Sequence, residues 1–166
     1  MLQQLIPAEI DLYTKDDPVR PHIPAEFRRS HGRQVWGLFE DKYALYDEPS
    51  HKPRAIICVA YTWDIPTNEQ ELERYSHAHS RGGPLSTDTA VFYTVWSYDA
   101  GAGREIVNTL AAHILDTRKE IEQWVTLSPL TEMASRFHIK NGAVLHSVHD
   151  TCQVFEYSHL LKGNDT

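Results

Sequence analysis

A serine and a histidine in the second half of the chain carry its most specific chemistry. Ser128 ends an apolar stretch of strand length, and His138 ends a short stretch of helical character. A hydroxyl can stabilise negative charge that develops on an oxygen atom, and an imidazole can donate a proton. Because His138 would lie in the last turn of its helix, the dipole favours the imidazolium, and we expect an acid near neutral pH.

Each residue of this pair also has a purely structural interpretation. Ser128 precedes Pro129, as a helix N-cap precedes a proline at the first helical position. His138 stands shortly before Asn141 and Gly142, so it could serve only as the cationic partner of a helix C-terminus. These alternatives stay open when each residue is considered alone.

A glycine-containing turn precedes the pair. Gly101 and Gly103 separate an apolar strand, Ala90 to Tyr98, from a helix at about Arg104 to Lys119. The backbone N–H groups of such a turn converge above the positive end of the helix dipole and form an anion cradle, although a plain tight turn is the alternative. A cradle beside a hydroxyl and an imidazole suits a pyrophosphate-bearing acyl carrier, and we expect coenzyme A. The expected binding residues are Tyr98, Ala100, Gly101, Ala102, Gly103 and Arg104.

Hydrophobic spacing predicts the elements that position these residues. Strands are expected at Val35–Phe39, Tyr43–Tyr46 and Ala55–Tyr61, followed by weak helical character at Asn68–His79. Strands at Ala90–Tyr98, Ile121–Leu127, Ala143–Val148 and Cys152–Tyr157 then alternate with helices at about Arg104–Lys119 and Leu130–His138. Strands joined by a helix are expected to be parallel with a right-handed connection. The predicted fold is therefore a single α/β (α+β) domain, a mixed sheet with a central crossover helix.

Composition narrows the class of protein. The 166 residues suffice for one domain, and the formal net charge of −7 argues against a general nucleic-acid binder. No apolar run could cross a membrane, and the first residues do not resemble a secretory signal. Cys58 and Cys152 lie in strand-like segments where buried thiols are expected, so we expect a cytoplasmic protein. Residues 1–33 are expected to form an irregular or helical segment that packs on the domain at 34–166.

The histidines elsewhere do not favour a metal site. His77 and His79 have no cysteine or carboxylate pair at a supporting spacing, so a solvated loop is the better interpretation. His146 and His149 on a strand would point to opposite faces. We expect no metal, and no cofactor beyond the coenzyme A moiety of the substrate.

Several motifs together resemble a known family. Tyr98 to Gly103 is a degenerate form of the Q/R-x-x-G-x-G/A signature of GNAT acyltransferases. The segments Ala90–Val95, the glycine turn with Glu105, Thr126–Pro129 and Phe137–Leu145 follow the order of FYSIS, GxxGxE, SLSP and FHLxNGAxL in the catalytic domain of malonyl-CoA decarboxylases. The resemblance covers roughly Val35 to Leu161, without the helical domain that usually precedes this one in that family.

The resemblance implies a GNAT-type fold and a decarboxylase of fatty acid metabolism, which converts malonyl-CoA or a related malonyl thioester to acetyl-CoA and CO2 through an enolate. It implies Ser128 and His138 as the catalytic pair, Glu105 as a supporting carboxylate, and Tyr157, or His159 in its place, as the tail tyrosine. One alternative is an acyl-CoA-dependent N- or S-acyltransferase in which Glu105 or His138 is the base. Another is a non-catalytic acyl-CoA sensor or subunit. A homo-oligomer or a separate helical partner domain is compatible with each.

Overall fold

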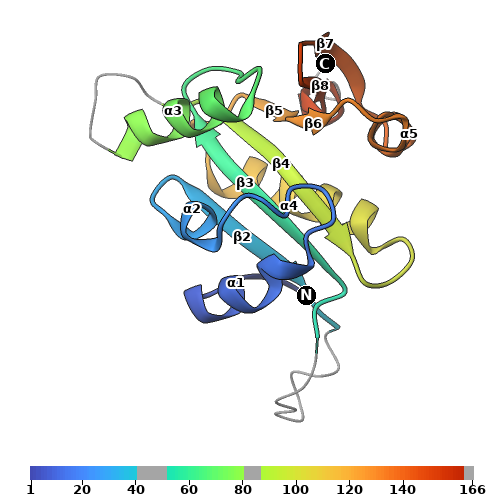
Figure 1. The fold of residues 1–166 in the computed structure, drawn as a ribbon. Coiled ribbons are helices and arrows are strands. Elements are labelled where there is room, and N and C mark those ends of the chain that lie inside the picture. Colours follow the sequence, from blue (N-terminus) through green and yellow to red (C-terminus); the bar gives the residue numbers. More distant parts are fainter. Residues whose placement is uncertain (41–51, 81–86, 163–166) are drawn as a thin grey trace.

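The computed structural model describes residues 1–40, 52–80 and 87–162 as one sheet with helices on both faces (Figure 1). Its strands are β1 (Leu2–Gln4), β2 (Arg33–Leu38), β3 (Ala55–Thr62), β4 (Thr89–Ser97), β5 (Gln123–Thr126), β6 (Ser128–Pro129), β7 (Val144–Val148) and β8 (Cys152–Glu156). Its helices are α1 (Pro7–Tyr13), the 3-10 helix η1 (Thr14–Asp16), α2 (Ala25–Arg29), α3 (Glu69–Ser80), α4 (Ala102–Thr117), α5 (Glu132–Lys140) and α6 (Ser158–Lys162). The strand expected at 43–46 lies outside the described residues. The other expected elements are present, with small shifts at their ends.

The strands form a mixed sheet in the order β1-β2-β3-β4-β5-β8-β6, and β7 pairs with β8. The central strand β3 is buried along its whole length, as its continuous apolar sequence predicts. β4 and β5 are parallel and are joined by α4, whereas the other described pairs are antiparallel. The predicted crossover and mixed sheet are therefore confirmed.

Each face of the sheet has its own apolar core. Side chains alternate along β3, so Ile57 packs toward Leu110 of α4, whereas Ile56 packs toward Ile10 of α1 and Leu72 of α3. In Figure 1, α4 accordingly lies behind the sheet, and α1, α2 and α3 lie in front of it. The crossover helix and the N-terminal segment thus cover opposite faces of the strands that carry the site.

Residues 1–33 contribute more than the helical segment expected from the sequence. Leu2–Gln4 form β1, an edge strand antiparallel to β2, and its 3 residues are too few for a visible hydrophobic alternation. Further along, the fully buried Asp17 carboxylate accepts hydrogen bonds from Arg28 at 2.8 Å and from the Thr94 hydroxyl at 3.0 Å. A buried charge needs such partners, so this pair attaches the segment to β4. The domain division at residue 33 stays a prediction.

Two expectations from composition can be compared with the structure. Cys58 and Cys152 are buried and free of disulfides, as expected. Burial raises the pKa of the Cys58 thiol to about 11, because a thiolate there would lose its hydration. Among the helices formed by the described residues, none combines the length and apolar character needed to cross a bilayer.

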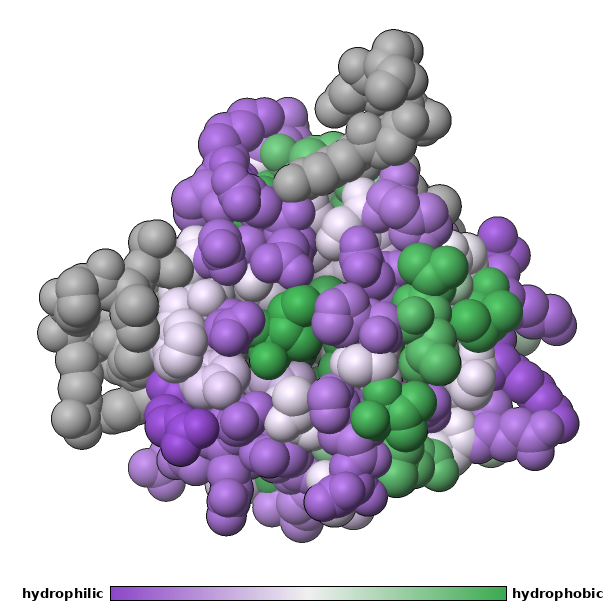
Figure 2. Space-filling view, turned by 90° about the horizontal axis from the view of Figure 1, so that it is seen from above, coloured by the Kyte–Doolittle hydropathy of each residue, from purple (hydrophilic) through white to green (hydrophobic). Residues whose placement is uncertain are grey.

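Apolar side chains gather on one side of the surface. Figure 2 shows them on the right of the view from above, where α5 and β7 lie. The exposed large apolar residues of these elements and the adjoining turns are Leu130, Met133, Ile139, Val144, Leu145 and Val148. This apolar surface therefore belongs to the C-terminal part of the chain.

Candidate functional site

A cleft opens where β4 and β5 separate. The parallel pairing of these strands ends at Phe92, whose carbonyl accepts a hydrogen bond of 3.1 Å from the N–H of Leu127. β4 continues to Ser97, whereas the chain after Leu127 turns to pair with β8 as β6. Because the second half of β4 does not pair with β5, a cavity of about 350 Å³ remains beside it.

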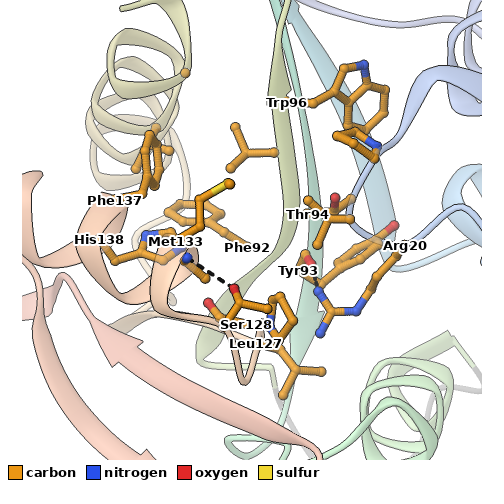
Figure 3. A pocket seen from close by; sticks show the side chains of 18 of the residues that line it. Arg20, Phe92, Tyr93, Thr94, Trp96, Leu127, Ser128, Met133, Phe137 and His138 are labelled. Carbon is orange, nitrogen blue, oxygen red and sulfur yellow. Dashed lines mark hydrogen bonds between the residues drawn. The ribbon is translucent and has the colours of Figure 1, made fainter.

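The cleft has walls from three parts of the chain (Figure 3). Phe137 and His138 of α5 lie on one side, Trp96 of β4 and Arg20 of the N-terminal segment lie on the other, and Ser128 lies between them. Most of the remaining wall is apolar and includes Phe92, Val95, Val107, Leu127 and Met133. Since Met133 is 80% exposed, the apolar surface of α5 borders the mouth of the cleft. An apolar cleft with a few convergent polar groups is the usual form of a small-molecule site.

The two glycines of the turn have different functions. Gly101 is the N-cap of α4 and has a φ of 80°, a conformation that a β-carbon would strain. Gly103 has no positive φ but lines the cleft. A β-carbon at Gly103 would lie 3.5 Å from the Phe137 ring and 3.8 Å from Ser97. Gly101 therefore supplies the backbone conformation, and Gly103 supplies the space.

Ala100 and Ala102 can contribute only backbone groups to the expected cradle. Ala102 is fully buried in the core, and its N–H donates to the Asp99 carbonyl at 3.2 Å. Ala100 and Arg104 are exposed. The N–H groups of Gly103 and Arg104 have no acceptor among the described residues, as is usual in the first turn of a helix. These two donors fit the expected anion cradle, while the binding itself stays a prediction.

Arg54 holds the glycine turn from outside the cleft. Its guanidinium lies 3.0 Å from the Glu105 carboxylate and 3.4 Å from Asp99. Glu105 is half exposed and is not among the residues that line the cleft, so a catalytic role for it stays a prediction. The Tyr98 hydroxyl donates to Asp16 at 2.8 Å, and burial raises the pKa of Tyr98 to about 12. Tyr98 thus ties the turn to the N-terminal segment.

Ser128 lies in β6, paired with Gln153 of β8, and is 3% exposed. It is not the cap of α5, because Thr131 is the N-cap and accepts a hydrogen bond of 3.2 Å from Ala134 N. The capping interpretation of Ser128 is therefore wrong. The Ser128 hydroxyl instead lies 2.8 Å from the hydroxyl of Thr126, at the edge of the cleft.

His138 lies in the last turn of α5 as expected, but it is neutral. It is 6% exposed, and burial lowers its pKa to about 4 because an imidazolium would lose its hydration. The expected imidazolium is wrong, since this desolvation outweighs the helix dipole. Nδ1 lies 2.7 Å from the Tyr157 hydroxyl, which also accepts a bond of 3.2 Å from Asn141 Nδ2. Tyr157 is then best satisfied by donating to Nδ1, which leaves the imidazole hydrogen on Nε2.

Of the two tail residues considered, Tyr157 and His159, Tyr157 is the one that contacts the His138 imidazole. Burial raises the pKa of Tyr157 to about 12, so its hydroxyl keeps its proton, whereas His159 is exposed on α6. Asn108 Nδ2 lies 3.4 Å from Asn141 Oδ1 and extends the chain of polar groups to α4. Sequence analysis assigned no role to Asn141 or Thr126, although FHIKNGA and TLSP contain them.

The remaining histidines form no metal site in the described part of the chain, where no three candidate ligands cluster. His77 and His79 belong to α3 rather than to a loop, and their side chains lie outside the description. His146 and His149 both hydrogen-bond the Ser147 hydroxyl, at 3.0 and 2.8 Å. The expectation of opposite faces is therefore wrong, and β7 has a register shift between Leu145 and Ser147.

Solved structures resemble this chain, whereas no protein-family model and no curated protein sequence matches it. A malonyl-CoA decarboxylase from Agrobacterium vitis matches over 82% of this chain and 35% of its own, with a TM-score of 0.60 and 19% identity. The GphF GNAT-like decarboxylase, in complex with isobutyryl-CoA, matches over 94% of this chain and 97% of its own, with a TM-score of 0.66 and 10% identity.

An N-acetyltransferase from Staphylococcus aureus Mu50 matches over 94% of this chain and 99% of its own, with a TM-score of 0.51 and 15% identity. The chain spans about a third of the length of the malonyl-CoA decarboxylases that it matches. At these identities the matches establish the fold, and they confirm the one that the sequence motifs implied.

Proposed function

We propose that this chain, which has the GNAT fold, is an acyl-CoA decarboxylase that acts on malonyl-CoA or a related malonyl thioester. The observation that carries the proposal is the arrangement of Ser128 and neutral His138 at one end of a cleft that begins at the glycine turn. The malonyl-CoA decarboxylases and the GphF decarboxylase among the structural neighbours support an acyl-CoA substrate.

Ser128 is suited to hold the thioester oxygen. The Phe155 N–H donates to the Thr126 hydroxyl oxygen at 3.1 Å, so Thr126 can give its own hydrogen to Ser128, 2.8 Å away. The Ser128 hydrogen is then available to the substrate. When the bond to the carboxylate carbon breaks, its electron pair passes into the enolate, and the charge on oxygen is stabilised by this hydrogen bond.

His138 is suited to protonate the carbon that CO2 leaves. Nε2 carries a hydrogen, and a neutral imidazole can donate it in a site where a cation would be costly. As Nε2 gives its proton to carbon, Tyr157 can pass its own proton to Nδ1 across 2.7 Å, so that the ring stays neutral. A proton from water later returns to Nε2 while Nδ1 gives its hydrogen back to the Tyr157 oxygen, which restores both groups.

The acyltransferase alternative requires a base for an amine or a thiol. Glu105 pairs with Arg54 and does not line the cleft, which counts against it as that base. His138 has its Nδ1 engaged by Tyr157 and, in the tautomer described above, carries a hydrogen on Nε2. The site therefore favours proton donation over proton abstraction.

The test is incubation of the whole chain with malonyl-CoA in D2O, followed by mass spectrometry of the products. We expect CO2 and acetyl-CoA that carries one deuterium on its methyl group, because the proton comes from an exchangeable donor. Ser128→Ala serves as the matched control and should form little product. Acylation of an amine from a panel, without any loss of CO2, would replace this proposal with the acyltransferase.

A further inference from the structure

A second pocket, of about 320 Å³, lies near the opposite end of α4 from the cleft. Gly103 in the first turn of α4 lines the cleft, whereas Arg118, which follows the last turn, lines the second pocket. With 16 residues at about 1.5 Å each, α4 is about 24 Å long. The second pocket is therefore separate from the acyl-CoA cleft.

The side chains around this pocket are cationic or neutral. Arg29, His31, Arg33 and Arg118 line it, together with Tyr61 and a few polar residues. No carboxylate is among the lining residues that the structure describes, although the chain has a net charge of −7. Such a concentration of positive charge marks a site for an anion.

Arg33 is the central observation. It is 8% exposed, and its guanidinium donates to Ser76 at 3.0 Å, to the Glu73 carbonyl at 3.1 Å and to the Ser30 hydroxyl. These acceptors are uncharged, and no carboxylate of the described residues lies within 4.0 Å of this guanidinium. Burial lowers the pKa of Arg33, although the more distant Glu73 carboxylate acts in the opposite direction. A buried cation normally has an anionic partner at ion-pair distance, and among the described residues Arg33 has none.

Arg118 is held in a fixed orientation at the same pocket. Its guanidinium stacks 3.7 Å from the centre of the Tyr61 ring, and the Tyr61 hydroxyl donates to Gln34 at 2.7 Å. A guanidinium fixed in this way is prepared to bind an oxyanion through two parallel N–H groups.

The acidic partners of the outer arginines are replaceable. Arg118 pairs with Glu120 at 2.9 Å, and Arg29 pairs with Asp11 at 2.5 Å. Both carboxylates are at least half exposed, and ion pairs of this kind add little to stability because solvent screens them. An anion that contacts several of the arginines together can displace them.

We propose that this pocket binds a small oxyanion of the phosphate type, either free phosphate or the phosphate group of a small ester. The Arg33 and Arg118 guanidinium groups bind its oxygens, and Arg29 adds a third positive charge at the rim. The proposal rests on these contacts alone and is independent of the function proposed for the cleft.

The test is a titration of the whole chain with inorganic phosphate, at constant ionic strength in a chloride buffer, followed by thermal unfolding. We expect a saturable rise in melting temperature for the wild type. Arg118→Gln, which removes a partly exposed side chain, should weaken the apparent affinity by about tenfold or more. Arg136→Gln is the matched control, because Arg136 is 74% exposed and pairs with Glu132 on α5.

A local measurement separates this site from the cradle for coenzyme A. Phosphate should shift the Nε–Hε signal of Arg33 in ¹H–¹⁵N spectra, even with the cleft saturated by coenzyme A. Tighter binding of glycerol phosphate than of inorganic phosphate would identify an ester as the ligand, and the reverse order would identify free phosphate. The proposal is overturned by wild-type protein without saturable binding, by an equal response in Arg118→Gln, or by a response that coenzyme A abolishes.

Discussion

The Ser128 hydroxyl and the His138 imidazole are both nearly buried and both uncharged. Each has a hydrogen-bond partner inside the protein. The Ser128 hydroxyl contacts the Thr126 hydroxyl, and His138 Nδ1 contacts the Tyr157 hydroxyl. With Thr126 and Tyr157 as the donors in these contacts, as proposed above, each has one hydrogen to offer to a molecule in the cleft. Two neutral donors suit a reaction in which negative charge develops on the substrate, because they avoid the desolvation of a permanent cation.

Removing either donor should affect turnover far more than binding. Ser128→Ala and His138→Ala should each lower the rate of CO2 release from malonyl-CoA by about a hundredfold or more, because these contacts strengthen in the transition state. Affinity for malonyl-CoA, measured by calorimetry, should change much less. Thr131→Ala is the control: loss of the cap of α5 should destabilise the protein by about 1 kcal/mol and leave turnover nearly intact. Wild-type turnover in Ser128→Ala would remove Ser128 from the mechanism.

The neutrality of His138 can be measured through stability. The imidazole has a pKa of 6.5 in the unfolded chain and about 4 in the folded one, so acid adds a proton to the unfolded state first. The neutral imidazole therefore contributes its full share of the unfolding free energy above pH 6.5, and this share is lost as the pH falls toward 4. Between pH 7.5 and 5, the wild type should lose about 2 kcal/mol more unfolding free energy than His138→Gln. Urea unfolding of both proteins over this pH range gives this difference. Equal slopes for wild type and His138→Gln would mean that folding does not lower the pKa of the ring.

At the scale of elements, the site exists because β4 is longer than its pairing with β5. The cleft runs along the half of β4 that does not pair with β5, from Phe92 near Ser128 to Ser97 near the glycine turn. Over this stretch a strand rises about 17 Å, which is ample for an extended acyl-carrier arm. The ends of α4 and α5 then place the cradle and the imidazole on the same opening.

The two glycines should respond differently to substitution. Gly101→Ala forces a β-carbon into a left-handed conformation and should lower stability by about 1 kcal/mol with binding retained. Gly103→Val should remain folded but abolish acyl-CoA binding, because its branches extend beyond a β-carbon that already lies 3.5 Å from Phe137. Calorimetry with coenzyme A and melting curves on both variants check this. A folded Gly103→Val variant with unchanged affinity would exclude the cradle.

At the scale of the whole molecule, the N-terminal segment completes the cleft. Pro18, Val19 and Arg20 line it, and their position depends on Asp17, whose carboxylate also accepts the backbone N–H groups of Val19 and Arg20 at 2.8 and 3.0 Å. The Arg20 guanidinium in turn donates to the Tyr93 carbonyl of β4. The segment is therefore part of the ligand site as well as a cover for the sheet.

Breaking the buried pair should loosen this wall. Asp17→Asn leaves the fully buried Arg28 without a counter-charge and should lower the unfolding free energy by about 3 kcal/mol or more. Acyl-CoA affinity should fall with it. The double variant Asp17→Asn/Arg28→Met should recover part of the lost stability, because no unpaired charge is then buried. Urea unfolding of both variants measures this, and a loss below 1 kcal/mol in Asp17→Asn would contradict the assigned role.

The sequence by itself determined the order of the elements from β2 onward and indicated the residues of the candidate site. The apolar run of β3, the helical spacing of α4 and the turn at Gly101 are local properties, so periodicity and turn chemistry reveal them. The motifs around Ser128 and His138 indicated a hydroxyl and an imidazole as the reactive groups, because the sequence gives residue types directly. β1 escaped prediction because so short an edge strand depends on its partner.

Only the tertiary structure decided what these residues are in physical terms. Burial is the sum of contacts from distant segments, and it makes His138 neutral where the dipole alone favours a cation. Thr131 caps α5, so Ser128 is not needed as the cap. The contact with Tyr157 favours one tautomer of the His138 imidazole. Such properties arise from contacts of β8, α5 and the N-terminal segment around β4. These segments lie far apart in the sequence, so no local pattern predicts the contacts.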